Sequence, residues 1–113
     1  MINKKQLREQ YRLLKPVMGV YRLVFTIDGT EYYGWTKTLD RIENTLFFRL
    51  SVQALQNYSE LQKRFNEFHR EAFDFSIVET LSYENDEHDY DEELALLLEL
   101  YMQNNPKAKE IHV

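Results

Sequence analysis

Every glycine of the chain, Gly19, Gly29 and Gly34, lies within one window of seventeen residues, GVYRLVFTIDGTEYYGW. The same window holds Tyr21 and Tyr32, each two residues from a glycine. A positioned phenol can relay a proton in acid–base chemistry, and a glycine lets the backbone approach a site without a side chain in the way. The window therefore combines two features that a catalytic site requires.

The alternation of residue types across this window predicts two β-strands joined by a tight turn. Asp28 and Gly29 in its middle are a strong hairpin signal, because a type I′ turn needs positive φ at both central residues. With a two-residue loop, Tyr21 and Tyr32 project from one face of the hairpin and Tyr33 projects from the other. A four-residue loop preserves this arrangement, whereas a loop of odd length would move Tyr32 to the opposite face.

The rest of the chain predicts four helices and a third strand. A helix over about residues 3–15 should end before Pro16, because proline disfavours helical geometry in the residue before it. Helical spacing of apolar residues predicts further helices over residues 39–50, 59–69 and 92–102, and the alternating stretch AFDFSIVETL predicts a strand over residues 72–81. We therefore expect an α+β fold, a small three-stranded antiparallel sheet flanked by helices, in one domain of residues 1–113.

Composition and charge limit the classes of function. The chain has no cysteine, which excludes disulfides and thiolate metal sites, and it shows no signal-peptide region or long apolar run, so we expect a cytoplasmic protein with no membrane partner. Residues 1–70 carry 12 Lys and Arg against 7 Asp and Glu, whereas residues 71–113 carry 2 against 12. The net charge of -5 argues against strong nucleic-acid binding, although the basic part could contact phosphates. The acidic C-terminal helical segment, about residues 88–105, could face solvent or a protein partner.

Two triplets in the hairpin resemble the signature triplets of the GIY-YIG nuclease superfamily. They are residues 19–21, Gly-Val-Tyr, and residues 32–34, Tyr-Tyr-Gly, one on each predicted strand. The resemblance covers roughly residues 15–105 and includes the following helix, the stretch FHREAFDFSIVE that leads into the third strand, and a later helix with Glu99 two residues before an aromatic side chain. It implies a GIY-YIG-like fold.

The resemblance also implies a set of site residues. Members of the superfamily hydrolyse DNA phosphodiesters with one divalent metal ion, usually magnesium. By resemblance, Tyr21 and Tyr32 are the site tyrosines, one of them acting directly or through water as general base, and Glu99 binds the metal ion. Gly19 and Gly34 are the backbone positions of the motif. A bound magnesium ion would polarise a phosphoryl oxygen and lower the pKa of its bound water.

One position departs from the superfamily pattern. The superfamily carries an arginine ten residues after the first residue of the second triplet, where it stabilises the charge on the scissile phosphate, but this chain has Ile42 there. Its neighbour Arg41 takes that place only if the helix begins in a different register, since one helical residue corresponds to about 100° of rotation. Two functions therefore stay open: a metal-dependent DNA endonuclease with reduced or lost activity, and a non-catalytic DNA-binding or protein-interaction module.

Overall fold

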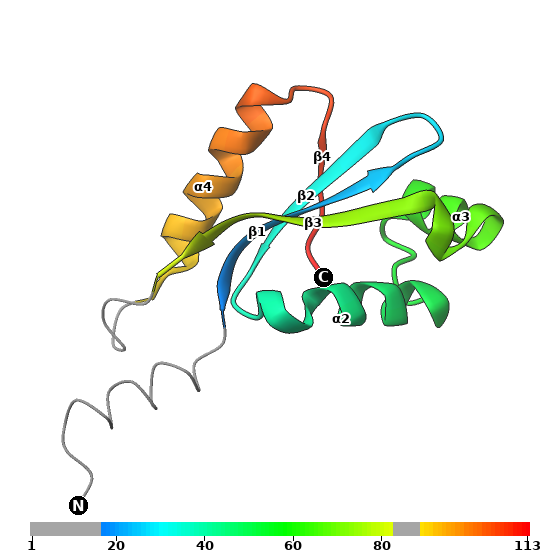
Figure 1. Ribbon diagram of the computed structural model, residues 1–113, viewed down its shortest axis with the longest axis horizontal. Helices are drawn as coiled ribbons and strands as arrows, with labels where there is room; N and C mark the ends of the chain where they lie inside the picture. Colours follow the sequence, from blue (N-terminus) through cyan, green and yellow to red (C-terminus); the bar gives the residue numbers. More distant parts are fainter. Residues whose placement is uncertain (1–16, 83–88) are drawn as a thin grey trace, which may run out of the picture.

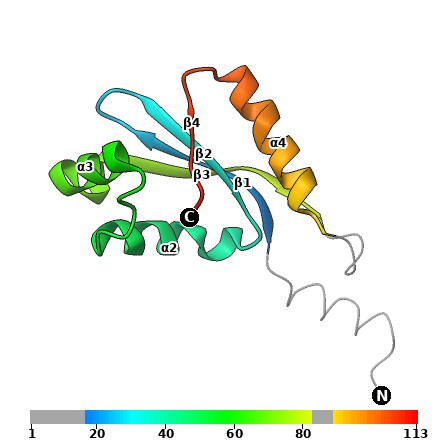
Figure 2. The ribbon, with the colours of Figure 1, turned by 180° about the vertical axis from the view of Figure 1, so that it is seen from behind.

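A central β-sheet with helices on both faces makes up the part of the chain that the structure describes, residues 17–82 and 89–113. In this computed structural model the elements are β1 (Met18–Phe25), β2 (Thr30–Thr36), α2 (Leu39–Ser51), α3 (Ser59–Phe68), a 3-10 turn (Arg70–Ala72), β3 (Phe73–Leu81), α4 (Asp91–Asn104) and β4 (Lys109–Glu110). Helix α4 lies on one side of the sheet, and α2 and α3 lie on the other (Figures 1 and 2). The predicted helix over about residues 3–15 and most of the acidic loop before α4 lie outside the described residues. None of the helices in the described ranges combines the length and apolar character that crossing a membrane requires.

The predicted α+β class is confirmed, but the sheet has four strands instead of three, in the order β3-β1-β2-β4. Strands β2 and β3 pair antiparallel with β1, as expected. The additional strand β4 pairs parallel with β2, with Lys109 opposite Tyr32 and Glu110 opposite Tyr33. A strand of two residues is too short to carry a periodic pattern, so periodicity could not reveal it.

The loop of the β1–β2 hairpin has four residues, 26–29, and not the two of the simplest prediction, because Phe25 pairs with Thr30. The side chain of Asp28 holds this longer loop. Its Oδ1 atom accepts hydrogen bonds from the backbone N–H of Thr30 at 2.9 Å and from the Thr30 hydroxyl at 2.7 Å. Gly29 has a φ of +79°, which glycine adopts without steric cost. The Asp-Gly pair therefore marks the turn correctly, and it occupies the last two of the four loop residues.

The even loop length confirms the predicted facing of the tyrosines. Tyr21 and Tyr32 belong to the core layer between the sheet and helices α2 and α3, whereas Tyr33 packs with Leu98 of α4 on the other face. The predicted apolar stripe of α2 is buried against the first of these layers. It consists of Leu39, Ile42, Leu46 and Leu50.

Candidate active site

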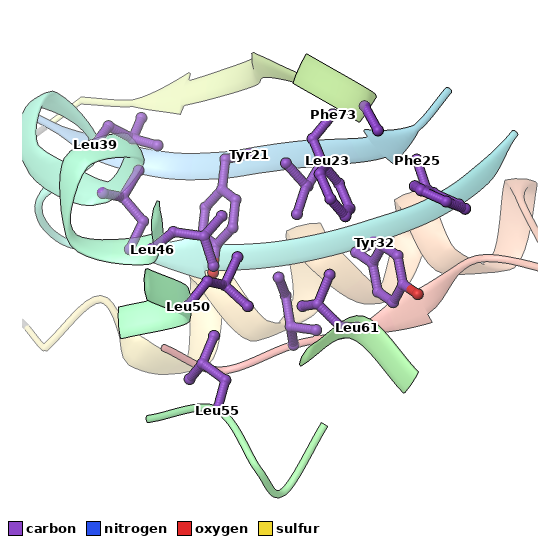
Figure 3. Packing of buried hydrophobic residues seen from close by; sticks show 13 residues of the cluster. Tyr21, Leu23, Phe25, Tyr32, Leu39, Leu46, Leu50, Leu55, Leu61 and Phe73 are labelled. Carbon is purple, nitrogen blue, oxygen red and sulfur yellow. The ribbon is translucent and has the colours of Figure 1, made fainter. Parts of the chain in front are cut away.

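Tyr21 is a fully buried residue at the centre of β1. Its side chain points into the same layer as that of Tyr32, but the two reach different parts of it (Figure 3). Within the described residues the Tyr21 hydroxyl has no hydrogen-bond partner. Burial raises the pKa of this hydroxyl well above the ordinary tyrosine value; Tyr58 raises it further and Arg49 lowers it. Tyr21 is therefore a neutral phenol in this conformation, enclosed by protein.

Gly34 lies directly opposite Tyr21 in the β1–β2 ladder, so the last residue of one triplet faces the last residue of the other. A Cβ atom at position 34 would overlap the Tyr21 hydroxyl and lie 2.5 Å from its Cζ atom. It would also lie 2.7 Å from the carbonyl oxygen of Ile111. Gly34 thus makes room for the phenol ring. Gly19, the other motif glycine, gives similar room, because a Cβ there would meet the backbone of β3.

The Tyr32 hydroxyl lies among charged side chains. It accepts a hydrogen bond from Nη1 of Arg64 at 3.1 Å and donates one to Oε1 of Glu60 at 3.4 Å. Arg64 also pairs with Asp28 at 2.8 Å, and Lys109 pairs with Glu60 at 2.7 Å. We call these five residues the Tyr32 cluster. They come from the hairpin, α3 and β4, which are distant in the sequence.

The charges of the Tyr32 cluster fix which of its groups hold protons. Burial raises the pKa of Tyr32, Arg64 lowers it and Glu60 raises it again. The hydrogen bond from Lys109 lowers the pKa of Glu60, and the nearby Arg64 charge lowers it as well. Tyr32 is therefore a protonated donor and Glu60 an ionised acceptor at neutral pH. The phenol therefore donates to an ionised carboxylate, and the Arg64 cation lies beside its oxygen.

Neither residue 41 nor residue 42, at the start of α2, places an arginine side chain beside Tyr21 or Tyr32. Ile42 is 3% exposed and packs in the core layer that contains Tyr21. The side chain of Arg41 is 81% exposed, and its nearest acidic partner is Asp40, at 4.0 Å. The helix register therefore places an apolar side chain where the resemblance implies a cation.

Glu99 lies on α4, on the face of the sheet opposite Tyr21 and Tyr32. Its neighbour Leu98 packs against Val20 and Tyr33, and Glu99 itself is exposed. The structure thus brings Tyr21 and Tyr32 into one layer but leaves Glu99 outside it. The role implied for Glu99 stays a prediction.

Comparison with known proteins was informative at the level of structure. No protein-family model and no curated protein matches the sequence. The structure is similar to the catalytic domain of homing endonuclease I-TevI, with a TM-score of 0.65 and 20% sequence identity over 85% of this chain and 99% of that domain. A mutant of the same domain, described as that of an intron endonuclease, has the same score and identity and is covered over 94% of its length.

This chain has the GIY-YIG endonuclease fold. The fold predicted from the two triplets is thereby confirmed, and the predicted helix and strand order agrees with it.

The metal ion implied by the GIY-YIG resemblance can be tested against the donor groups present. In residues 17–82 and 89–113, no three His, Asp or Glu side chains gather closely enough to hold a metal ion. Glu60 is the carboxylate nearest a site tyrosine, but Arg64 and Lys109 already neutralise it. Glu99 is separated from both tyrosines by the sheet. The described residues therefore do not fit a metal centre that Glu99 shares with Tyr21 and Tyr32.

Sequence reasoning missed three members of the Tyr32 cluster. Glu60 and Arg64 form an ion pair at 3.0 Å, and their spacing of four residues on a predicted helix signals such a pair. Nothing in the sequence indicates that this pair meets Tyr32, 28 residues before Glu60. Lys109 reaches the site through β4, which the sequence does not predict. Long-range packing, and not local pattern, assembles this cluster.

Replacing Tyr21 by phenylalanine should raise the free energy of unfolding by about 1 kcal/mol, because it removes a buried hydroxyl that has no partner among the described residues. Tyr32→Phe is the matched control, since it removes a hydroxyl bonded to Glu60 and Arg64 and should not stabilise the protein. Urea denaturation of both variants measures the effect. A loss of stability in Tyr21→Phe would show that the hydroxyl has a partner in solution.

Proposed function

We propose that this domain acts on DNA as a GIY-YIG-type endonuclease whose phosphodiester hydrolysis is reduced or lost. The observation that carries the proposal is the fold, which matches 99% of the I-TevI catalytic domain. The burial of Tyr21 and Tyr32 in one layer, each within a motif triplet, supports the location of the site. The Lys and Arg side chains of residues 1–70 would supply the contacts to DNA phosphates.

Two features of the candidate site support reduced activity, namely the residue at position 42 and the burial of Tyr21. Removing one preorganised group that stabilises developing charge costs about 10²- to 10³-fold in rate, and here Ile42 replaces the implied arginine. The Tyr21 hydroxyl is also closed off from solvent. A magnesium requirement remains part of the proposal, but Glu99 is not assigned as its ligand at the tyrosines, because the sheet separates Glu99 from Tyr21 and Tyr32.

The test is cleavage of supercoiled and branched DNA with and without Mg²⁺, assayed beside the I-TevI catalytic domain. We expect Mg²⁺-dependent nicking at least about 10²-fold slower than that of the I-TevI domain. Tyr32→Phe should lower the rate further, whereas Tyr33→Phe, its neighbour on the opposite face, should not. Glu99→Ala tests whether Glu99 is required for nicking despite its position on the opposite face of the sheet. Nicking as fast as that of the I-TevI domain would contradict the reduced activity.

A second function, a non-catalytic module that binds DNA or a protein, is favoured by the closed Tyr21 hydroxyl. For DNA, binding should weaken steeply as salt increases, because each phosphate contact releases counterions. For a protein partner, the acidic C-terminal helical segment, about residues 88–105, is the proposed contact. Salt-dependent DNA binding with no turnover on any substrate would select this module over the enzyme.

A further inference from the structure

Residues 109–113 follow the edge of β2 and then cross into the core layer of the two tyrosines. Lys109 and Glu110 form β4, and the N–H of Ile111 donates a hydrogen bond to the carbonyl of Tyr33 at 2.9 Å. Ile111 is 1% exposed and belongs to the same buried cluster as Tyr21 and Tyr32. We call residues 109–113 the closing strap.

The closing strap lies next to Tyr21. The carbonyl oxygen of Ile111 reaches Gly34, directly beside the Tyr21 ring. The Tyr58 hydroxyl holds the strap at His112. It accepts a hydrogen bond from the N–H of His112 at 2.8 Å and donates one to the His112 carbonyl at 3.3 Å. Tyr58 is near enough to Tyr21 to influence its ionisation. The backbone bond to Tyr33 and the two hydrogen bonds with Tyr58 thus hold the strap next to Tyr21.

The closing strap also occupies the surroundings of Tyr32. Lys109 places its ammonium group 2.7 Å from Oε2 of Glu60, the carboxylate whose other oxygen accepts from Tyr32. A cavity of about 220 Å³ beside Tyr32 is lined by strap residues Lys109, Glu110 and Ile111 together with residues 58–61. The strap therefore supplies a positive charge and a wall at this second position.

The attachments of the closing strap are few compared with those of the sheet beneath it. Its strand has two residues, pairs in the parallel direction and lies at the sheet edge. Lys109, Glu110 and His112 are exposed, so the main buried anchor is Ile111. Segments with few buried contacts open locally at much lower free energy than the whole domain unfolds.

We propose that the closing strap is an autoinhibitory segment, which must open before the hydroxyl groups of Tyr21 and Tyr32 can meet a DNA phosphate. The contact with DNA rests on the proposed function, but the opening of the strap does not. Opening uncovers Tyr21 and frees Glu60 from Lys109, while the opposite face with Tyr33 and α4 keeps its packing. Tyr21 and Tyr33, on opposite faces of the sheet, therefore report different events.

Nitration of individual tyrosines, mapped by mass spectrometry in the full chain, tests the strap directly. Tyr58→Phe removes both hydrogen bonds to His112 and keeps the ring, and Ile111→Ala removes the buried anchor. Each should raise the nitration rate of Tyr21 about tenfold or more, because hydrogen bonds and burial that favour the closed state are lost, and should leave Tyr33 unchanged. The control Tyr101→Phe removes a hydroxyl that donates to Glu79 at 2.7 Å on the other face, and should change neither rate.

Two results would contradict the proposed role of the closing strap. An unchanged Tyr21 rate in both Tyr58→Phe and Ile111→Ala would show that the strap does not control access to this residue. Equal increases at Tyr21 and Tyr33 would show that the variants loosen the whole domain.

The DNA assay is kept separate from nitration, so that the two proposals can fail independently. If the strap opens and nicking or DNA binding rises about tenfold in the same variants, both the strap and the proposed function are supported. If Tyr21 becomes accessible while no variant acts on or binds DNA, the strap stands as a closing element and the proposed function is wrong. Strong nicking by the wild type with Tyr21 still protected would overturn the autoinhibitory role.

Discussion

Replacing Ile42 by arginine should lower the free energy of unfolding by about 3–5 kcal/mol, the cost of an uncompensated charge in a protein interior. Ile42 is 3% exposed and lies in the apolar stripe of α2 between Leu39 and Leu46. Its neighbours in the cluster are apolar side chains and the buried Tyr21 ring. A guanidinium group there has no carboxylate partner within the cluster and must either remain dehydrated or force α2 away from the sheet.

Asn44→Arg is the matched control for Ile42→Arg, because it adds the same side chain to an exposed position of the same helix. Its stability should change by no more than about 0.5 kcal/mol, as is usual for surface substitutions. Urea denaturation of both variants gives the comparison. If Ile42→Arg proved as stable as Asn44→Arg, the core layer would have to be more open at α2 than the structure shows.

This cost explains why one substitution cannot restore the superfamily pattern. In this fold the position of the implied arginine is part of the core, and its side chain faces inward with the rest of the stripe. Arg41, one residue earlier, points to solvent with an 81% exposed side chain. Arg64 does reach Tyr32, but Asp28 and Glu60 already neutralise it. A cation for a scissile phosphate would therefore require these ion pairs to rearrange.

The parts of the fold that could be predicted from sequence are those that local pattern determines. The period of two in β1 and β2 and the Asp-Gly turn give the hairpin, and an even loop length is enough to place Tyr21 and Tyr32 on one face. The stripe of α2 follows from apolar residues three and four apart. The loop itself is two residues longer than the simplest prediction, and within it the Asp28 side chain accepts two hydrogen bonds from Thr30.

The candidate site was less predictable, because contacts across long stretches of sequence create it. The partners of the Tyr32 hydroxyl come from α3, and Lys109 comes from a two-residue strand with no pattern of its own. The Tyr21–Gly34 pairing follows from the four-residue loop, and the sequence left open whether the loop has two residues or four. Ile111 is a single apolar residue in a polar segment, so no sequence pattern indicated that it joins the buried cluster of Tyr21.

Gly34→Ala should lower the free energy of unfolding by about 2–3 kcal/mol, the usual cost of adding volume to a packed core. The new methyl group would overlap the Tyr21 hydroxyl, lie 2.5 Å from Cζ of that ring and lie 2.7 Å from the carbonyl oxygen of Ile111. Neither obstacle moves easily, since the ring is fully buried and stacked on Phe75 and the carbonyl belongs to the backbone. The added methyl group would therefore push against both the Tyr21 ring and the closing strap.

A double-mutant cycle with Tyr21→Leu identifies the source of that cost. Leucine lacks the ring atoms that the methyl group would meet, so Gly34→Ala should cost about 1–2 kcal/mol less in the Tyr21→Leu background than in the wild type. The remaining cost reports the carbonyl of Ile111, and Ile111→Ala, which keeps that carbonyl but loosens the strap, should reduce it. Urea denaturation of the four proteins of the cycle supplies the coupling energy. Equal costs in both backgrounds would mean that Tyr21 does not lie over Gly34, and the pairing of the two triplets would then need a different register.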